Sequence, residues 1–303
     1  METLRSIVVG VDLAADGSTS VGSRRAIDQA CWLAERNGAR ITLLHSSAPD
    51  EAWSAADGGY VDTPAPSDAP AALAALAADT VPTGLEVDVA SEEAPAWRAI
   101  TQHVLRHGGD LVIAGKRTRS IANAPLLGSV TAKLLRKCPC PVWVVKPDAS
   151  TGLRRILAAT DLSAVGDRVI ALAASLADLA DAEFHVVHAL QRPLSVQMEG
   201  DAVSEQWARD ERTKAIEQIH GALEGSRSAA SAMLHVGVTS PSRAVLDGFA
   251  HLSPDLVVMG TVSRGGVPGL LVGNTAERLL PRLDGSLLTV KPADFVCPVP
   301  ASP

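Results

Sequence analysis

The sequence contains one stretch twice, at residues 110–146 and again at residues 255–291. Each copy reads as a continuous apolar run ending on a glycine, a loop, a second glycine, a short helical segment and another apolar run. The spacing is identical, since the two glycines stand 13 positions apart in both copies (128 − 115 and 273 − 260). These glycines are Gly115, Gly128, Gly260 and Gly273. A stretch repeated without a gap indicates that the chain contains one structural unit twice.

The repeated stretch predicts two strands joined through a helix. Its apolar runs have the length of strands that are covered on both faces. Parallel strands with a helical crossover form a right-handed βαβ unit. The glycine at the carboxyl end of the first strand lets the backbone approach a ligand. The next helix directs its free N–H groups and positive dipole end into the same crevice, a geometry suited to a phosphate.

The segments in front of each copy follow the same order of elements. We expect strands at 6–11, 40–45, 85–90, 155–160, 184–188 and 233–238, and helices at 18–37, 71–79, 95–107, 165–180, 197–224 and 241–251. The fold class is therefore α/β, with one five-stranded domain duplicated. We place the two domains at 1–147 and 153–293, the linker at 148–152 and a C-terminal tail at 294–303. Residues 46–70 are expected to form a mobile loop, and residues 298–303 a frayed end.

Length and composition limit the function classes. A chain of 303 residues, 47% hydrophobic and 20% charged, has room for about two domains with substantial cores. Its net charge of −7 argues against a nucleic-acid or anionic-membrane surface. A strand begins almost at once and no apolar run approaches about 18 residues, so we expect a cytoplasmic protein without a secretory signal or membrane span. The four cysteines are too few and too scattered for a disulfide framework.

Each half resembles a universal stress protein domain, and the whole chain resembles the tandem, E-type members of that family. The ATP-binding members carry a glycine, two residues, a glycine, nine residues, and a glycine followed by Ser or Thr. The resemblance is carried by the blocks at 134–139, 142–143, 260–262 and 273–277. It implies HUP-like, Rossmann-like domains, each a five-stranded parallel sheet of order 3-2-1-4-5 flanked by helices. The last strands of the two halves would pair across a two-fold axis, and a homodimer is left open.

The resemblance also implies a ligand, typically an adenine nucleotide such as ATP or AMP. It requires no cofactor and leaves a bound Mg²⁺ open. On the adenine side it implies contacts from Asp12 and the backbone of Ser46, and from Asp161 and the backbone of Ala189. On the phosphate side it implies Gly115, Gly128 and Ser129 in the first half, and Gly260, Gly273, Asn274 and Thr275 in the second.

Both halves depart from the family pattern. The second glycine is replaced by Thr118 and by Ser263, and the final Ser or Thr of the second half is Asn274. A Cβ narrows the space for a phosphate and disfavours a positive φ, so we expect reduced ATP affinity in both halves. The first half keeps more of the pattern. It adds a basic run from Lys116 to Arg119 that would meet phosphate charge.

Structural explanations stay open for the same residues. Asp12 and Asp161 would also cap the turns that follow their strands. Asn274 with Glu277 three residues later resembles a capping box. The basic run after Gly115 would also suit a solvated loop.

Other chemically active residue types are assigned structural roles. His45 and His188, at matching strand ends, are expected to be hydrogen-bonded and partly buried rather than general bases. The Cys138-Pro139-Cys140 motif has no second Cys or His pair at zinc spacing, so a metal or redox role is not favoured. Trp143 is assigned to core or interface packing.

The leading hypothesis is a regulatory protein of the stress response that binds an adenine nucleotide or another small anionic ligand, without committed catalysis. The alternatives are a scaffold that acts through protein partners and a weak ATP-hydrolysing enzyme. A Rossmann dehydrogenase would need Gly-x-Gly-x-x-Gly after its first strand, where this chain has Val11-Asp12-Leu13-Ala14. The sequence offers no nucleophile–base pair and no acidic cluster for a metal.

Overall fold

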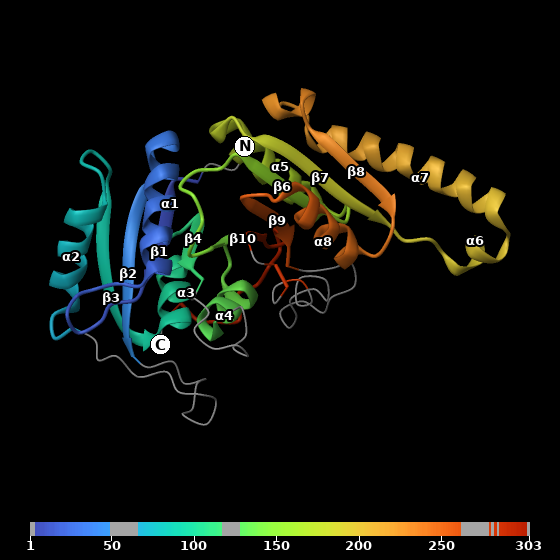
Figure 1. Cartoon of the computed structure of the whole chain (residues 1–303). Helices are drawn as coiled ribbons and strands as arrows, with labels where there is room; N and C mark the ends of the chain where they lie inside the picture. Colours follow the sequence, from blue (N-terminus) through green and yellow to red (C-terminus); the bar gives the residue numbers. More distant parts are fainter. Residues whose placement is uncertain are drawn as a thin grey trace.

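The computed structural model describes residues 4–48, 66–116, 128–261, 279, 282–283 and 285–301. Its strands are β1 (Ser6–Val11), β2 (Arg40–Ala48), β3 (Val87–Pro95), β4 (Leu111–Gly115), β5 (Val142–Val145), β6 (Arg155–Thr160), β7 (Glu183–Leu190), β8 (Met233–Val238), β9 (Leu256–Gly260) and β10 (Ser286–Val290). Its α-helices are α1 (Val21–Asn37), α2 (Ala69–Thr80), α3 (Ala96–His107), α4 (Ser129–Lys137), α5 (Ala164–Ala180), α6 (Leu194–Met198), α7 (Asp201–Ala222) and α8 (Pro241–Leu252). Figure 1 shows their arrangement.

The ten strands form one sheet of order β3-β2-β1-β4-β5-β10-β9-β6-β7-β8. Numbered within each half, the order is 3-2-1-4-5 twice, and neighbouring strands of one half run parallel. The halves meet at β5 and β10, which pair antiparallel with Leu288 opposite Trp143. Two parallel sheets thus join edge to edge, and neither leaves its last strand unpaired.

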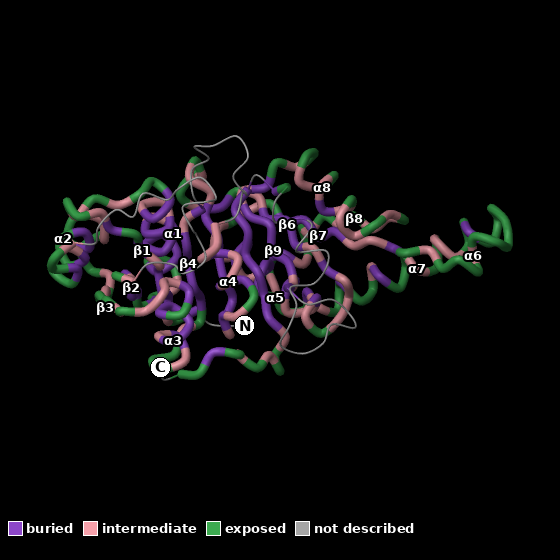
Figure 2. The backbone as a smooth tube through the Cα atoms, turned by 90° about the horizontal axis from the view of Figure 1, so that it is seen from below, coloured by how far each residue is buried: buried purple, intermediate pink, exposed green. Residues whose placement is uncertain are grey.

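Helices cover both faces of this sheet, as the buried strands predict. On one face, α1, α2, α5 and α7 pack on a core that includes Ile7 and Trp143 from the first half and Ile156 from the second. On the other face, α3, α4 and α8 pack on a second core that includes Val8. Figure 2 shows the buried strands running through the middle of the molecule.

Local signals placed the carboxyl end of α1 correctly at Asn37, whereas the helix begins at Val21, three residues after the expected start at Ser18. Ser20 caps the helix by accepting a hydrogen bond from the N–H of Ser23, and Gly38 ends it in the left-handed conformation at φ 65°. The predicted loop from residue 46 is wrong for residues 46–48, because β2 continues through them to pair with an equally extended β3. Whether residues 49–65 are mobile lies outside the described residues.

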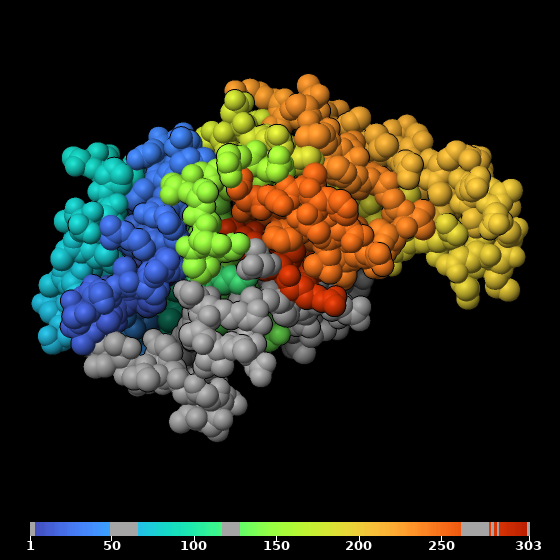
Figure 3. Space-filling model, viewed as in Figure 1, coloured from blue at the N-terminus to red at the C-terminus, as the bar shows by residue number. Residues whose placement is uncertain are grey.

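The predicted helix at 197–224 is two helices, because Gly200 adopts a φ of 97° between α6 and α7. Only Ser204, Ala215 and Ile219 of α7 are buried. Figure 3 shows the α6 end of this pair (yellow) projecting from the body of the molecule. No helix in the described part of the chain has the length and apolar character of a membrane span.

The predicted frayed end is wrong for residues 298–301. Val299 is buried in the core beside α3 and α4, and the Gln102 side chain donates a hydrogen bond to the Pro300 carbonyl at 3.2 Å. The chain after β10 therefore crosses back onto the first half. This contact depends on the pairing of the halves, which no local pattern reveals.

Candidate functional site

The carboxyl ends of β1 and β4 lie side by side in the first half. Their pairing runs from Ile7 with Leu111 to Gly10 with Ala114, so Asp12 and Gly115 come to the same edge of the sheet. Strand order reverses between β1 and β4, and open α/β sheets bind ligands at such a point. The expected first-half site therefore starts from this edge.

Asp12 is held at the edge by the amino end of α1. Its Oδ1 accepts hydrogen bonds from the Thr19 hydroxyl at 2.9 Å and the Ser20 N–H at 3.0 Å, and its N–H donates to Ser23 Oγ at 3.1 Å. Burial alone would raise the pKa of Asp12, but the hydrogen bonds with Ser23, Ser20 and Thr19 hold it below its usual value. One carboxylate oxygen thus has the capping role that the sequence left open, and the group is ionised at neutral pH.

Gly115 has no side chain because α1 leaves no room for one. A Cβ there would lie 2.1 Å from the carbonyl carbon of Gly22, in the first turn of that helix. A Cβ on Gly22 would in turn lie 2.7 Å from the Lys116 carbonyl oxygen. The structure therefore gives a packing reason for this glycine, where the sequence suggested close approach of the backbone to a ligand.

Lys116 lies in the seam between the halves. Its side chain is buried, and Nζ donates a hydrogen bond to the Leu283 carbonyl of the second half at 2.9 Å. Its N–H continues the β4–β5 ladder by donating to the Val145 carbonyl at 2.8 Å. The Nζ contact joins the two halves, and the phosphate contact of Lys116 stays a prediction.

Gly128 and Ser129 begin α4, which follows β4 along the chain and starts at the same edge of the sheet. Gly128 is the N-cap residue, in an extended conformation (φ −65°, ψ 156°), and no side chain of the described residues caps this helix. α1 differs, because Ser20 caps its amino end. Among the described residues, the amino end of α4 therefore has no side-chain cap of the kind that Ser20 gives α1. Thr118, in the loop before it, lies outside the described residues.

The second half repeats part of this arrangement. Asp161 Oδ1 accepts hydrogen bonds from the N–H and hydroxyl of Ser163, which caps α5. Gly260 ends β9 as Gly115 ends β4. The other predicted phosphate contacts, at Ser263, Gly273, Asn274 and Thr275, lie outside the described residues.

The residues predicted to contact adenine through their backbones lie in strand ladders. Ser46 pairs with Glu92 between β2 and β3, and its hydroxyl donates to the Ala94 carbonyl at 2.5 Å. Ala189 pairs with Gly237 between β7 and β8. Ser46 lies on β2 one residue beyond His45, where the pairing of β2 with β1 ends, so its position agrees with an adenine-side contact, which stays a prediction.

His45 and His188 have twin positions beside the two strand ends. His45 Nδ1 lies 3.0 Å from the Val11 carbonyl, and His188 Nδ1 lies 2.9 Å from the Thr160 carbonyl. A carbonyl only accepts, so Nδ1–H donates in both rings. The predicted hydrogen bonds of these histidines are confirmed at Nδ1, whereas the buried His45 Nε2 has no partner among the described residues.

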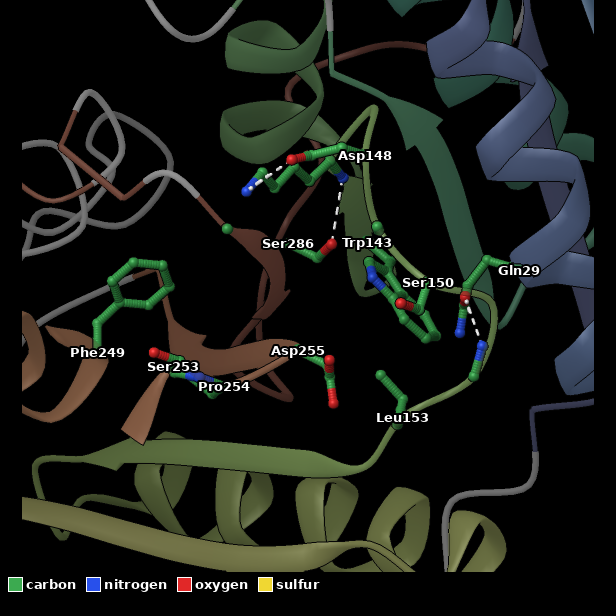
Figure 4. Close-up of a pocket in the computed structure, with 14 residues that line it drawn as sticks. Gln29, Trp143, Asp148, Ser150, Leu153, Phe249, Ser253, Pro254, Asp255 and Ser286 are labelled. Atoms are coloured by element: carbon green, nitrogen blue, oxygen red, sulfur yellow. Dashed lines mark hydrogen bonds and ion pairs between the residues drawn. The ribbon is translucent and has the colours of Figure 1, made fainter. Parts of the chain in front are cut away.

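A cavity of about 350 Å³ lies at the seam, between the linker and the amino ends of β9 and β10 (Figure 4). It is lined by Gln29, Trp143, Leu153, Phe249, Asp255 and Ser286, among others. Gln29 Nε2 and Trp143 Nε1 are buried there, and neither has a hydrogen-bond partner in the described ranges of the chain. Sequence reasoning assigned Trp143 to packing and missed the cavity, because only the joined sheet brings α1 and α8 together across the seam. The described residues hold no group of three or more His, Cys, Asp or Glu suited to a metal ion.

Comparisons with known proteins agree with the fold. The sequence model of the universal stress protein family matches residues 3–146 and 152–291. Universal stress protein E of Escherichia coli K12 is 30% identical over 233 residues, which cover 71% of either chain. A universal stress protein of Mycobacterium bovis is 26% identical over 90% of this chain and 92% of its own. The crystal structure of a putative universal stress protein from Pseudomonas aeruginosa superposes with a TM-score of 0.66 at 25% identity, covering 97% of this chain and 95% of that chain.

Proposed function

Because the chain belongs to the universal stress protein family, we propose that it acts in the stress response by binding a small ligand at the sheet edge of its first half. The ligand is an adenine nucleotide, ATP or AMP, or another small anion. Binding changes the shape or the partners of the protein, and no chemical step is required.

The observation that carries this proposal is a helix amino end that lacks a side-chain cap in the described part of the chain, at the sheet edge where Asp12 is ionised. No described side chain caps the amino end of α4, which follows β4 along the chain, and Asp12 directly follows the neighbouring strand β1. Helix amino ends favour anions through their N–H groups and dipole. Asp12 keeps its Oδ1 engaged by Thr19 and Ser20, so its other oxygen would accept from a ribose hydroxyl or a base amino group.

The first half is favoured because it keeps more of the family pattern at its described positions. Gly128 and Ser129 stand at the amino end of α4, whereas the second half replaces the Ser or Thr by Asn274. The histidines nearest to the edge have the same structural contact in both halves. His45 and His188 both use Nδ1–H to hold a strand end.

A scaffold that acts through protein partners is the second candidate. It is favoured by two predicted ligand residues that have other contacts here. Gly115 packs on Gly22, and Lys116 donates to the Leu283 carbonyl. These contacts give both residues a structural role, so their presence in the sequence does not require a nucleotide.

Isothermal titration of the full chain with ATP, ADP and AMP tests the proposal. We expect one nucleotide per chain, and we expect Gly128→Val to weaken binding at least about tenfold by filling the space beside the helix end. Valine tolerates the extended backbone at this position, so the fold should persist. A folded Gly128→Val variant with unchanged affinity would refute the site.

A matched pair of substitutions locates the adenine side. Asn keeps an oxygen that accepts from the helix end, so Asp12→Asn and Asp161→Asn change the charge with little change in shape. We expect Asp12→Asn to weaken binding and Asp161→Asn to leave it unchanged. No binding by the wild-type chain would favour the scaffold.

A further inference from the structure

Three thiols and one ammonium group converge where α4 ends. Cys138 is the C-cap residue of α4 and Cys140 follows two residues later, with their sulfur atoms 3.6 Å apart. Cys138 is fully buried, and Cys140 is 8% exposed. Cys297, on the segment after β10, packs against the same core and donates through Sγ to the Lys137 carbonyl at 3.2 Å.

The ammonium group belongs to Lys291, which stands just after β10 of the second half. It is 3% exposed, and its Nζ donates to the carbonyls of Leu135 and, at 3.1 Å, of Arg136. Nζ also lies 4.6 Å from the centre of the Phe295 ring. A buried positive charge thus sits at the carboxyl end of α4, beside the two thiols of the first half.

The pKa values of the Cys138 and Cys140 thiols shift in opposite directions. The hydrogen bond from Cys140 lowers the pKa of Cys138 despite burial, and the Lys291 charge adds to the effect. The same hydrogen bond, together with burial, raises the pKa of Cys140. When the pair loses one proton, Cys138 is therefore the sulfur that carries the charge and Cys140 keeps its proton, the arrangement of an attacking sulfur and its resolving partner.

Cys31 provides an internal comparison. It is buried in α1, and burial with the nearby charges of Asp28 and Glu35 raises the pKa of Cys31 to about 11. No cationic group is among the causes that act on this thiol, and no thiol contact involving it is found in the described part of the chain. It represents an inert structural cysteine.

We propose that Cys138 and Cys140 form a peroxide-reactive dithiol site that closes to a disulfide. The Cys138 thiolate attacks one oxygen of hydrogen peroxide, the O–O bond breaks, and hydroxide leaves and is protonated by solvent. Cys138 is then a sulfenic acid. The Cys140 sulfur attacks it, the S–O bond breaks, and the proton of Cys140 leaves with the hydroxyl group as water. Two thiols are oxidised to one disulfide, and one peroxide is reduced to two waters.

Access to the site is controlled by the C-terminal segment. Val299 and Cys297 share the core of Cys138 and Cys140, and Gln102 holds the Pro300 carbonyl. The oxidant is small and uncharged, so a partial lift of this segment suffices to admit it. Loss of the thiolate on oxidation leaves Lys291 without its anionic neighbour, which weakens the packing of the segment that carries it.

Treatment of the folded full chain with hydrogen peroxide tests the site. Thiols are blocked with an alkylating reagent under denaturing conditions, and the peptides are weighed. We expect the peptide containing Cys138 and Cys140 to lose two hydrogen masses and to escape alkylation, while Cys31 is alkylated in full. Equal oxidation of Cys31, or full alkylation of Cys138 and Cys140, would overturn the proposal.

Two variants separate the roles. Cys140→Ser should stop the reaction at the Cys138 sulfenic acid, which a dimedone adduct reveals. Lys291→Met should slow disulfide formation by about tenfold, because the ammonium no longer favours the thiolate. A Cys140→Ser chain that gives no adduct, or an unchanged rate in a folded Lys291→Met chain, would contradict the assigned roles.

Discussion

Gly22 and Gly115 bring two main chains into direct contact at the edge of the sheet. The first turn of α1 rests on the end of β4, so that neither residue has room for a Cβ. This contact fixes where α1 begins, and with it Thr19 and Ser20, which hold the Asp12 carboxylate. The close packing at Gly115 thus helps to position the Asp12 carboxylate, which follows the neighbouring strand β1.

Gly115→Ala should therefore destabilise the protein. The new Cβ would lie 2.1 Å from Gly22, and forced overpacking costs about 1–3 kcal/mol. The expected result is a clear fall in the midpoint of thermal unfolding. Gly237→Ala is the matched control, because a Cβ in that strand meets nothing within 4 Å. Equal midpoints for the two variants would contradict the packing explanation.

The sequence predicted the positions of Asp12 and His45 at strand ends, but it did not predict that Lys116 contacts the other half. Asp12 follows a buried apolar run and His45 ends another one, and the end of such a run is a local feature of the sequence. The position of Lys116 depends on Leu283, which belongs to the other half of the chain. No spacing within the first half contains that information.

Among the helices, α4 has an unusual carboxyl end, because a lysine from the other half caps it. A helix leaves its last carbonyls without partners, and here the buried Lys291 ammonium donates to two of them. Cations favour this end of a helix, but burial opposes the charge. Burial lowers the pKa of Lys291 to about 8, while the neighbouring cysteines act in the opposite direction.

This lysine makes stability depend on pH in a defined window. Between about pH 8 and 10.5 the unfolded chain holds a proton that the folded chain has released, so rising pH favours the folded state. Relative to Lys291→Met, the wild-type chain should gain up to about 3 kcal/mol of unfolding free energy across this window. Urea unfolding of both chains at pH 7 and pH 10 measures the gain. A difference between the chains that stays constant with pH would contradict the lowered pKa.

Element types were predicted from periodicity, whereas several element ends required the tertiary structure. α1 ended at Gly38 as expected, since a glycine C-cap is a local signal. The extension of β2 to Ala48 arises from pairing with β3, which lies far along the chain. The break at Gly200 was missed because apolar spacing continues on both sides of it.

At the scale of the molecule, the two halves form one sheet and share a core. β5 and β10 pair directly, and Lys116 and Lys291 each reach a helix end or carbonyl of the opposite half. The repeat in the sequence predicted two similar halves. It could not predict the seam cavity, the docked C-terminal segment or the converging thiols, because these arise only where the halves differ and touch.

The central claim is that the ligand binds at the sheet edge of the first half. Photo-crosslinking with an azido-substituted adenine nucleotide, followed by peptide mapping, tests this claim most directly. We predict that the label attaches within residues 1–147 and that excess ATP removes it. A label confined to residues 153–293, or one that ATP does not reduce, would contradict the account.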